Sequence, residues 1–231
     1  MNSAVLLAAG SSSRMGGELR KPFLMLAGRT VLDRTCEAFD QASLIDEIIL
    51  VCQIEDMAQM QAARETLPSL RKVSAIVEGG EERTDSVRAG VARVSVTAEV
   101  IAVHDVARPL VNPQDINRTV DTAAAKGAAF LALPVTDTIK VSSDGYYSEN
   151  TLDRSVLWRA QTPQAFRANV LRSHLLAAFE ENFRPTDDIA LHERYAELAA
   201  IVRGSEDNLK LTTPRDFAIA EAILSAREKS V

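Results

Sequence analysis

Short apolar runs alternate along the chain with segments in which apolar residues recur every three or four positions. Runs such as 47–52 are apolar at nearly every position, which is typical of parallel strands buried on both faces. The longer segments have the spacing of helices with one apolar face. The pattern predicts strands over residues 4–9, 47–52, 73–77, 100–104, 128–133 and 200–203. It predicts helices over residues 30–41, 56–66, 84–94, 113–126, 166–179 and 187–199, and from 213 onward.

Strands and helices in alternation predict an α/β fold: a Rossmann-like, mostly parallel sheet with helices on both faces. The pattern changes between residues 135 and 161. There the turn sequence Ser143-Asp144-Gly145 separates two strand-like runs, 138–141 and 146–148, and extended chain follows over 151–160. We therefore expect a projecting antiparallel β-arm at about 135–161. No linker or repeat interrupts the chain, so residues 1–231 are predicted to form one domain.

Composition narrows the classes of partner. Charged residues make up 25% of the 231 residues and the formal net charge is −6. Because no long basic run occurs, we expect no nucleic-acid partner. An acidic protein that handles phosphates has to concentrate its cations locally. The cations of interest on this ground are Arg14, Lys21, Arg108, Arg154 and Lys210.

Cys36 and Cys52 lie in a helical and a strand pattern, and neither has the spacing of a metal ligand, so we expect buried free thiols. The apolar start lacks the positive region of a signal peptide. No segment approaches the roughly 20 apolar residues of a membrane span. These features predict a cytoplasmic protein without a membrane partner.

Polar groups follow the predicted strands at their carboxyl ends, where open parallel sheets bind ligands. The first strand runs into a loop with Gly10, three serines and the cations Arg14 and Lys21. Glycines let backbone N–H groups approach a ligand closely, and these groups together with cations suit a polyphosphate. The third and fourth strands are followed by residues 78–86 and 104–109. An ordinary glycine-rich connection is the alternative interpretation of the first loop taken alone.

Individual side chains leave alternatives open. Asp105, directly after an apolar strand, is placed to hold Mg²⁺ together with phosphate oxygens, or else braces its loop. Ser86 either offers a hydroxyl near a base or caps a helix. We expect His104 to be a packed strand-end residue, and Arg83 and Arg88 to be solvated helix charges.

The motifs LAAGSSSRMG (7–16), GEERTDSV (80–87) and HDVARP (104–109) resemble those of the 2-C-methyl-D-erythritol 4-phosphate cytidylyltransferases, within the sugar and alditol nucleotidyltransferases. The likeness continues in order through 137–140, 153–154, 158, 161–164, 186–188 and 207–210. The resemblance implies a nucleotidyltransferase that moves a cytidylyl group from CTP to methylerythritol phosphate. It also implies Mg²⁺ and a homodimer formed through the β-arm.

The same resemblance implies residue roles. CTP would be bound by Ala8, Ala9, Gly10, Ser11, Ser12, Ser13, Gly80, Glu81, Ser86, Asp105 and Val106. The acceptor would be bound by Asp105, Arg108, Thr138, Arg154, Thr186 and Lys210. The residues with catalytic roles would be Arg14, Lys21, Arg154 and Lys210, and Asp105 would hold the metal. Arg154, on the arm, would act in the partner's site.

One departure from the family pattern concerns Lys21. The family usually has Pro-Lys-Gln where this chain has Arg20-Lys21-Pro22. Pro22 has no N–H and restricts Lys21 toward extended geometry. Arg20 is an alternative ligand for the same phosphates.

Three other functions remain open from the sequence. One is cytidylyl transfer to another polyol phosphate, such as ribitol 5-phosphate. Another is a non-catalytic nucleotide-binding protein. A dinucleotide-dependent oxidoreductase is disfavoured because the first loop lacks Gly-x-Gly-x-x-Gly.

Overall fold

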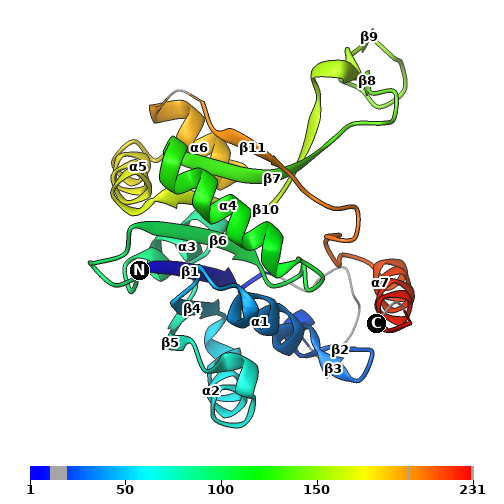
Figure 1. The fold of residues 1–231 in the computed structure, drawn as a ribbon. Coiled ribbons are helices and arrows are strands. Elements are labelled where there is room, and N and C mark those ends of the chain that lie inside the picture. The colour runs from blue at the N-terminus through cyan, green and yellow to red at the C-terminus, as the bar shows by residue number, and fades with distance from the viewer. Residues whose placement is uncertain (11–19, 197, 230–231) are drawn as a thin grey trace.

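A seven-stranded sheet forms the centre of the molecule (Figure 1). The computed structural model describes residues 1–10, 20–196 and 198–229. The strands are β1 (Asn2–Leu7), β4 (Glu47–Cys52), β5 (Val73–Glu78), β6 (Val100–Asp105), β7 (Ala128–Pro134), β10 (Trp158–Arg167) and β11 (Ala200–Arg203). Their order is β11-β7-β10-β6-β1-β4-β5. Only β10, between β6 and β7, runs antiparallel to its neighbours. The predicted mostly parallel α/β sheet is confirmed.

Helices cover both faces of the sheet because alternate residues of each strand point to opposite sides. Ala4 and Leu6 of β1 belong to one apolar cluster and Val5 to the other. The first face packs against α1 (Val31–Gln41), α2 (Met57–Thr66), α4 (Pro113–Lys126) and α7 (Pro214–Glu228). The second packs against α3 (Arg83–Val91), α5 (Ala168–Glu180) and α6 (Asp188–Tyr195).

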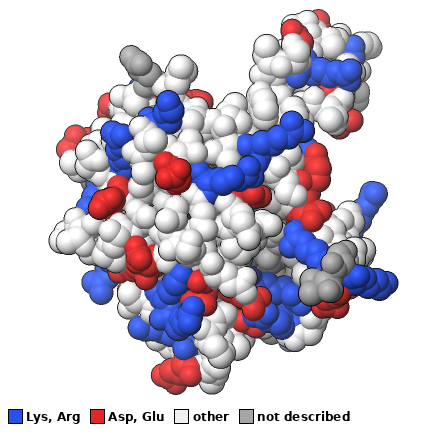
Figure 2. Space-filling model, in the orientation of Figure 1, with Lys and Arg blue, Asp and Glu red and all other residues white. Residues whose placement is uncertain are grey.

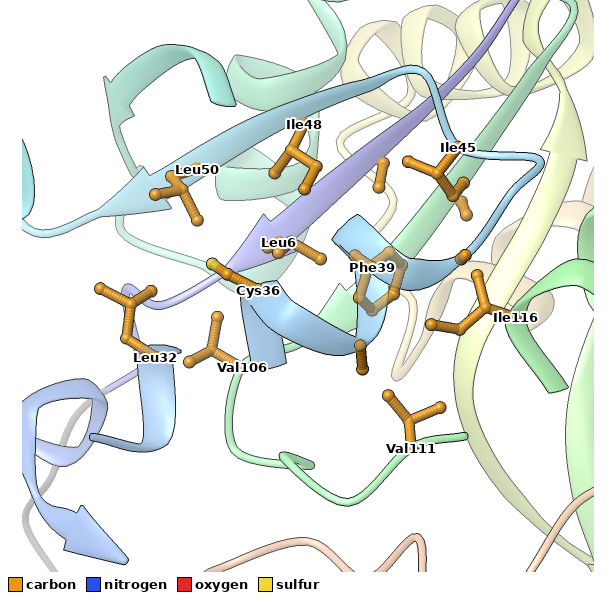
Figure 3. Packing of buried hydrophobic residues seen from close by; sticks show 14 of the residues in the cluster. Leu6, Leu32, Cys36, Phe39, Ile45, Ile48, Leu50, Val106, Val111 and Ile116 are labelled. Atoms are coloured by element: carbon orange, nitrogen blue, oxygen red, sulfur yellow. The ribbon is translucent and has the colours of Figure 1, made fainter. Parts of the chain in front are cut away.

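The core beneath α1 is closely packed (Figure 3). Phe39 and Cys36 of α1 face Leu6 of β1 and Ile48 of β4, and all four are fully buried. Burial in these apolar surroundings raises the pKa of the Cys36 thiol, and it raises that of Cys52 to about 11. The expected buried free thiols are confirmed.

Helix starts follow the capping residues in the sequence. The side chains of Thr30, Asn112 and Thr213 accept hydrogen bonds from backbone N–H groups in the first turns of α1, α4 and α7. Proline occupies the start of α4 and α7, where it sacrifices no helical hydrogen bond. Gly127 ends α4 with φ 99°, a conformation that favours glycine.

Strand β10 differs from the predicted pattern. Extended chain was expected only over 151–160, no element was assigned to 161–165, and the helix that follows was expected to begin at 166. Phe166 instead pairs with Ile101 and Ala128 in the sheet, and α5 begins at Ala168. The strand carries Gln161, Thr162 and Gln164, which look like loop residues. They are buried because tertiary hydrogen bonds satisfy them.

The predicted arm is present as the hairpin β8 (Lys140–Val141) and β9 (Asn150–Thr151), which projects from the body in Figure 1. The second strand was expected at 146–148. Asp144 instead accepts hydrogen bonds from the N–H groups of Tyr146 and Tyr147, which keeps both residues in the turn. The arm is also shorter than the expected 135–161, because residues 158–160 already pair with β7.

Short elements connect the main ones. The pair β2 (Met25–Leu26) and β3 (Arg29–Thr30) forms a small hairpin. The 3-10 helices are η1 (Lys21–Phe23), η2 (Ile54–Asp56), η3 (Pro68–Leu70) and η4 (Arg154–Val156). Cations and carboxylates are interspersed over the body and arm on the face shown in Figure 2. Within the described residues, no helix has both the length and the apolar character to cross a membrane.

Two histidines join α5 to α6. The rings of His174 and His192 lie 5.2 Å apart between centroids, and the ring of Tyr195 packs against His174 at a centroid distance of 5.6 Å. The Nδ1 atoms of both histidines are buried and have no hydrogen-bond partner among the described residues. Burial lowers the pKa of both imidazoles, and the charge of His192 lowers that of His174 further.

Acidification is therefore expected to destabilise the fold. The unfolded chain takes up protons on both histidines below about pH 6.5, whereas the folded chain takes them up only at lower pH because the pKa of each imidazole is lowered. The free energy of unfolding should fall by up to about 1.4 kcal/mol per pH unit for each histidine. Urea unfolding between about pH 7 and about pH 5 measures this, with the doubly substituted His174→Gln/His192→Gln protein as the comparison. Parallel pH profiles for the two proteins would contradict the assignment.

Candidate active site

A cavity of about 370 Å³ opens at the carboxyl ends of β1, β4, β5 and β6. These four strands are parallel, so the loops that follow them meet at one edge of the sheet. The cavity is lined by ten residues that the sequence had singled out: Ala8, Ala9, Gly10, Lys21, Gly80, Glu81, Ser86, Asp105, Val106 and Lys210. Ser11, Ser12, Ser13 and Arg14 lie outside the described residues.

The chain leaving β1 is fixed by its neighbour β4. The N–H of Ala8 donates to the carbonyl of Val51 at 2.7 Å, which prolongs the parallel pairing beyond the strand. The side-chain amide of Gln53 donates to the carbonyl of Ala9. The backbone that enters the predicted phosphate loop is thus held from one side.

The loop after β5 lies too close to its surroundings for larger residues. A Cβ on Gly79 would lie 2.7 Å from Cβ of Ala9 and 2.8 Å from Oγ of Ser86. The N–H of Gly80 donates to Oγ of Ser86 at 3.1 Å, so this hydroxyl braces the loop. The helix cap here is made by Glu82 and Asp85. Ser86 therefore does not have the capping role that was its alternative.

Asp105 ends β6 with its carboxylate between two cations. Nζ of Lys210 lies 2.7 Å from Oδ2, and Nε of Arg83 lies 3.5 Å from Oδ1. Burial alone would raise the pKa of this carboxyl. Arg83 and Lys210 more than offset that effect and hold the pKa at about 2. Asp105 is therefore fully ionised at neutral pH.

Arg83 is the cation that sequence reasoning misjudged. It was expected to be a solvated helix charge, but it lines the cavity and pairs with buried Asp188 at 2.9 Å. Burial lowers the pKa of Arg83, and the attraction of Asp188 and Asp105 outweighs this and raises it. Gln164 fixes the partner by accepting the N–H of Asp188 at 3.0 Å. Arg88 is more exposed and stacks over Phe179 at 4.3 Å.

His104 is a buried strand-end histidine, as expected, and burial lowers its pKa to about 3. Its Nε2 lies 3.2 Å from the carbonyl of Arg108, which can only accept, so Nε2 carries the proton. Nδ1 then accepts from the hydroxyl of Thr162 at 2.9 Å. That hydroxyl oxygen accepts the N–H of Asp105 at 3.2 Å. The chain of hydrogen bonds holds Asp105 in place and leaves His104 neutral.

Four predicted acceptor residues do not line this cavity within one chain. Arg108 donates from its guanidinium to the carbonyl of Asn208 at 2.8 Å. Arg154 lies on the arm and donates to the carbonyl of Thr136 at 2.8 Å. Thr138, on the arm, and Thr186, before α6, are exposed.

Three further residues that line the cavity were passed over by sequence reasoning: Val31, Gln53 and Thr212. Because Gln53 directly follows β4, a search for polar residues at the carboxyl end of each predicted strand could have found it. Arg20, the alternative to Lys21, pairs with Glu55 and Asp56 and is not among the described residues that line the cavity. No group of three or more His, Cys, Asp or Glu residues in the described part of the chain is arranged to hold a metal ion.

Chemically, the cavity combines close backbone N–H groups, the cations Lys21, Arg83 and Lys210, and the buried, ionised carboxylate of Asp105, with Glu81 and Glu82 also in its wall. Among the described residues of the cavity, no nucleophilic side chain is paired with a general base, because the nearby His104 is buried and neutral. The arrangement is suited to binding a polyphosphate and stabilising charge on it.

Comparison with known proteins identifies the family. Residues 3–226 match the family described as 2-C-methyl-D-erythritol 4-phosphate cytidylyltransferase. A relative of that name from Pelotomaculum thermopropionicum is 41% identical over 226 residues, covering 98% of this chain and 95% of the relative. Another, from Symbiobacterium thermophilum, is 43% identical over 223 residues, covering 96% of this chain and 92% of the relative.

Solved structures agree with the sequence matches. The crystal structure of 4-diphosphocytidyl-2C-methyl-D-erythritol synthase from Anaerococcus prevotii superposes with a TM-score of 0.85 at 29% identity, covering 96% of this chain and 95% of that one. The cytidylyltransferase from Thermus thermophilus gives 0.77 at 30% identity, covering 97% and 100%. The chain belongs to the 2-C-methyl-D-erythritol 4-phosphate cytidylyltransferase family.

Proposed function

We propose that this protein transfers the cytidylyl group of CTP to 2-C-methyl-D-erythritol 4-phosphate, giving 4-diphosphocytidyl-2-C-methyl-D-erythritol and pyrophosphate. Family membership over nearly the whole chain supports the reaction. The observation that carries the proposal to this chain's own residues is the cavity. It brings the loops after β1, β5 and β6 together around three cations and the buried carboxylate of Asp105.

The nucleotide would lie across this edge of the sheet. Gly80, Glu81 and Ser86 would meet the cytosine, because the loop after β5 presents backbone and a braced hydroxyl to the cavity. The triphosphate would lie against the backbone at Gly10, with Lys21 and Arg14 as counter-charges.

The chemistry is a substitution at the α-phosphorus. A phosphate oxygen of the acceptor forms the new P–O bond, and the bond to the β-phosphate oxygen breaks, so pyrophosphate leaves with the electron pair. The attacking phosphomonoester is already anionic at neutral pH and needs no general base, which agrees with a neutral, buried His104. Catalysis then consists of positioning and of charge stabilisation by Lys21 and Arg14.

A divalent cation fits the donor set at Asp105. One ionised carboxylate, together with phosphate oxygens and waters, is a typical Mg²⁺ environment. Such an ion would neutralise charge on the phosphates of CTP. Lys210, now paired with Asp105, is placed to follow the phosphates or the acceptor once the carboxylate binds the metal.

The arm supports a homodimer. It projects from the body and exposes large apolar side chains, with Tyr146 at 88%, Tyr147 at 77% and Val156 at 71%. Apolar side chains grouped on a projection are typical of an interface. In a symmetric dimer the arm would carry Arg154 and Thr138 to the partner's cavity. This placement would explain why neither residue lines the cavity of its own chain.

The choice of acceptor tests the reaction itself. Pyrophosphate release should be fastest with CTP and methylerythritol phosphate. Ribitol 5-phosphate, or ATP, GTP or UTP in place of CTP, should lower kcat/KM by about tenfold or more. A faster reaction with ribitol 5-phosphate would reassign the acceptor. Tight binding of CTP without turnover would instead indicate a non-catalytic protein.

Mixed dimers test the placement of Arg154. Lys21→Ala and Arg154→Ala should each keep the fold and lower kcat by about 100-fold or more. In a heterodimer of the two variants, one site receives intact Lys21 from its own chain and intact Arg154 from the partner. An equal mixture should regain about one quarter of wild-type activity after subunit exchange, since half the dimers are mixed and each has one complete site.

The control is Lys21→Ala alone taken through the same exchange, which should regain nothing. A mixture that stays as inactive as its components would show that Arg154 does not act across a dimer.

A further inference from the structure

Two parts of the cavity wall are attached to the same short segment, residues 53–56, which follows β4. Gln53 donates to the carbonyl of Ala9 and lines the cavity itself. On the other side, Arg20 forms two ion pairs with the segment: Nη2 lies 3.2 Å from Oε2 of Glu55, and Nε lies 3.3 Å from Oδ1 of Asp56. The wall formed by Lys21 and Pro22 begins at this contact.

Asp56 is the buried partner of Arg20. Only 7% of its side chain is exposed, and Oδ2 is buried without a hydrogen-bond partner among the described residues. Burial raises the pKa of this carboxyl, and the charge of Arg20 offsets part of the rise. Removing Arg20 would leave a buried carboxylate without its cation, which is costly. Glu55 is 62% exposed, so its pair is screened by solvent and contributes less.

The backbone carries this restraint directly to Lys21. The carbonyl of Arg20 accepts the N–H of Phe23 at 3.0 Å, and that of Lys21 accepts the N–H of Leu24 at 3.2 Å. Phe23 is buried, and Pro22 fixes its own φ within the same 3-10 turn. Lys21 therefore lies between a guanidinium anchored to Asp56 and a turn anchored in the core.

We propose that Arg20 is a positioning residue: its ion pair with Asp56 fixes the chain so that Lys21 faces the phosphates of CTP. The inference rests on the proposed function, and it assigns Arg20 a role different from that of phosphate ligand. Its guanidinium is directed to two carboxylates on η2. An arginine that bound phosphate here would have to give up both pairs and leave Asp56 buried and uncompensated.

The role predicts a specific pattern of kinetic effects. Arg20→Ala should lower kcat for cytidylyl transfer by about tenfold, with a smaller change in KM for CTP, because misplacing Lys21 weakens stabilisation of the transition state. Asp56→Asn, which keeps the size of the side chain, should give a similar loss. Arg20→Lys should restore part of the activity because it keeps the charge near Asp56.

The decisive measurement is the same substitution in a protein that lacks the lysine. In the Lys21→Ala background, Arg20→Ala should change kcat by less than about twofold, because no amine remains to be positioned. A merely structural role would give equal losses in both backgrounds. Arg71→Ala is the matched control. Nε of Arg71 lies 2.6 Å from Oδ1 of the largely buried Asp40, and neither residue lines the cavity. It should leave kcat at the wild-type value.

The outcomes separate this inference from the proposed function. An active wild type together with a fully active Arg20→Ala protein, or equal losses in both backgrounds, would overturn the role of Arg20 alone. A wild type that releases no pyrophosphate from CTP and acceptor would overturn the proposed function and this inference with it. If Arg20→Ala does not fold, Asp56→Asn in the two backgrounds gives the same comparison.

Discussion

The ionised carboxylate of Asp105, buried between Arg83 and Lys210, is the constraint on which the site depends. A carboxylate in such a place is unfavourable unless cations and hydrogen bonds compensate it. Lys210 comes from the loop after β11 and Arg83 from the start of α3, so the charge balance draws together segments far apart in the sequence. Their meeting point is the edge of the sheet where the cavity opens.

The surrounding layers hold this balance in place. Thr162 of β10 receives the N–H of Asp105 and fixes His104, and Gln164 of the same strand fixes the start of α6. Through Asp188, α6 then holds Arg83. Strand β10, the antiparallel strand of the sheet, thus connects the carboxylate of Asp105 on β6 to the cation of Arg83 on α3.

Local signals in the sequence were enough for much of the fold. The strand Glu47–Cys52 follows from its apolar run, and α4 follows from Asn112, its proline and Gly127. The inner part of strand β10 was left unassigned because its polar residues give no strand pattern until their buried partners are known. Arg83 was missed because its partner Asp188 lies 105 residues away in sequence. Motifs gave ten residues of the cavity wall, whereas the roles proposed for the arm residues would depend on a second copy of the chain.

We propose that Asp105, now paired with Lys210, would exchange this protein cation for a divalent cation that arrives with the nucleotide. Calorimetric titration of CTP into the wild-type and Asp105→Asn proteins, each with Mg²⁺ and with a chelator, measures this without turnover. Magnesium should strengthen CTP binding to the wild type by about tenfold or more and change binding to Asp105→Asn little. An equal effect of magnesium on both proteins would contradict the claim.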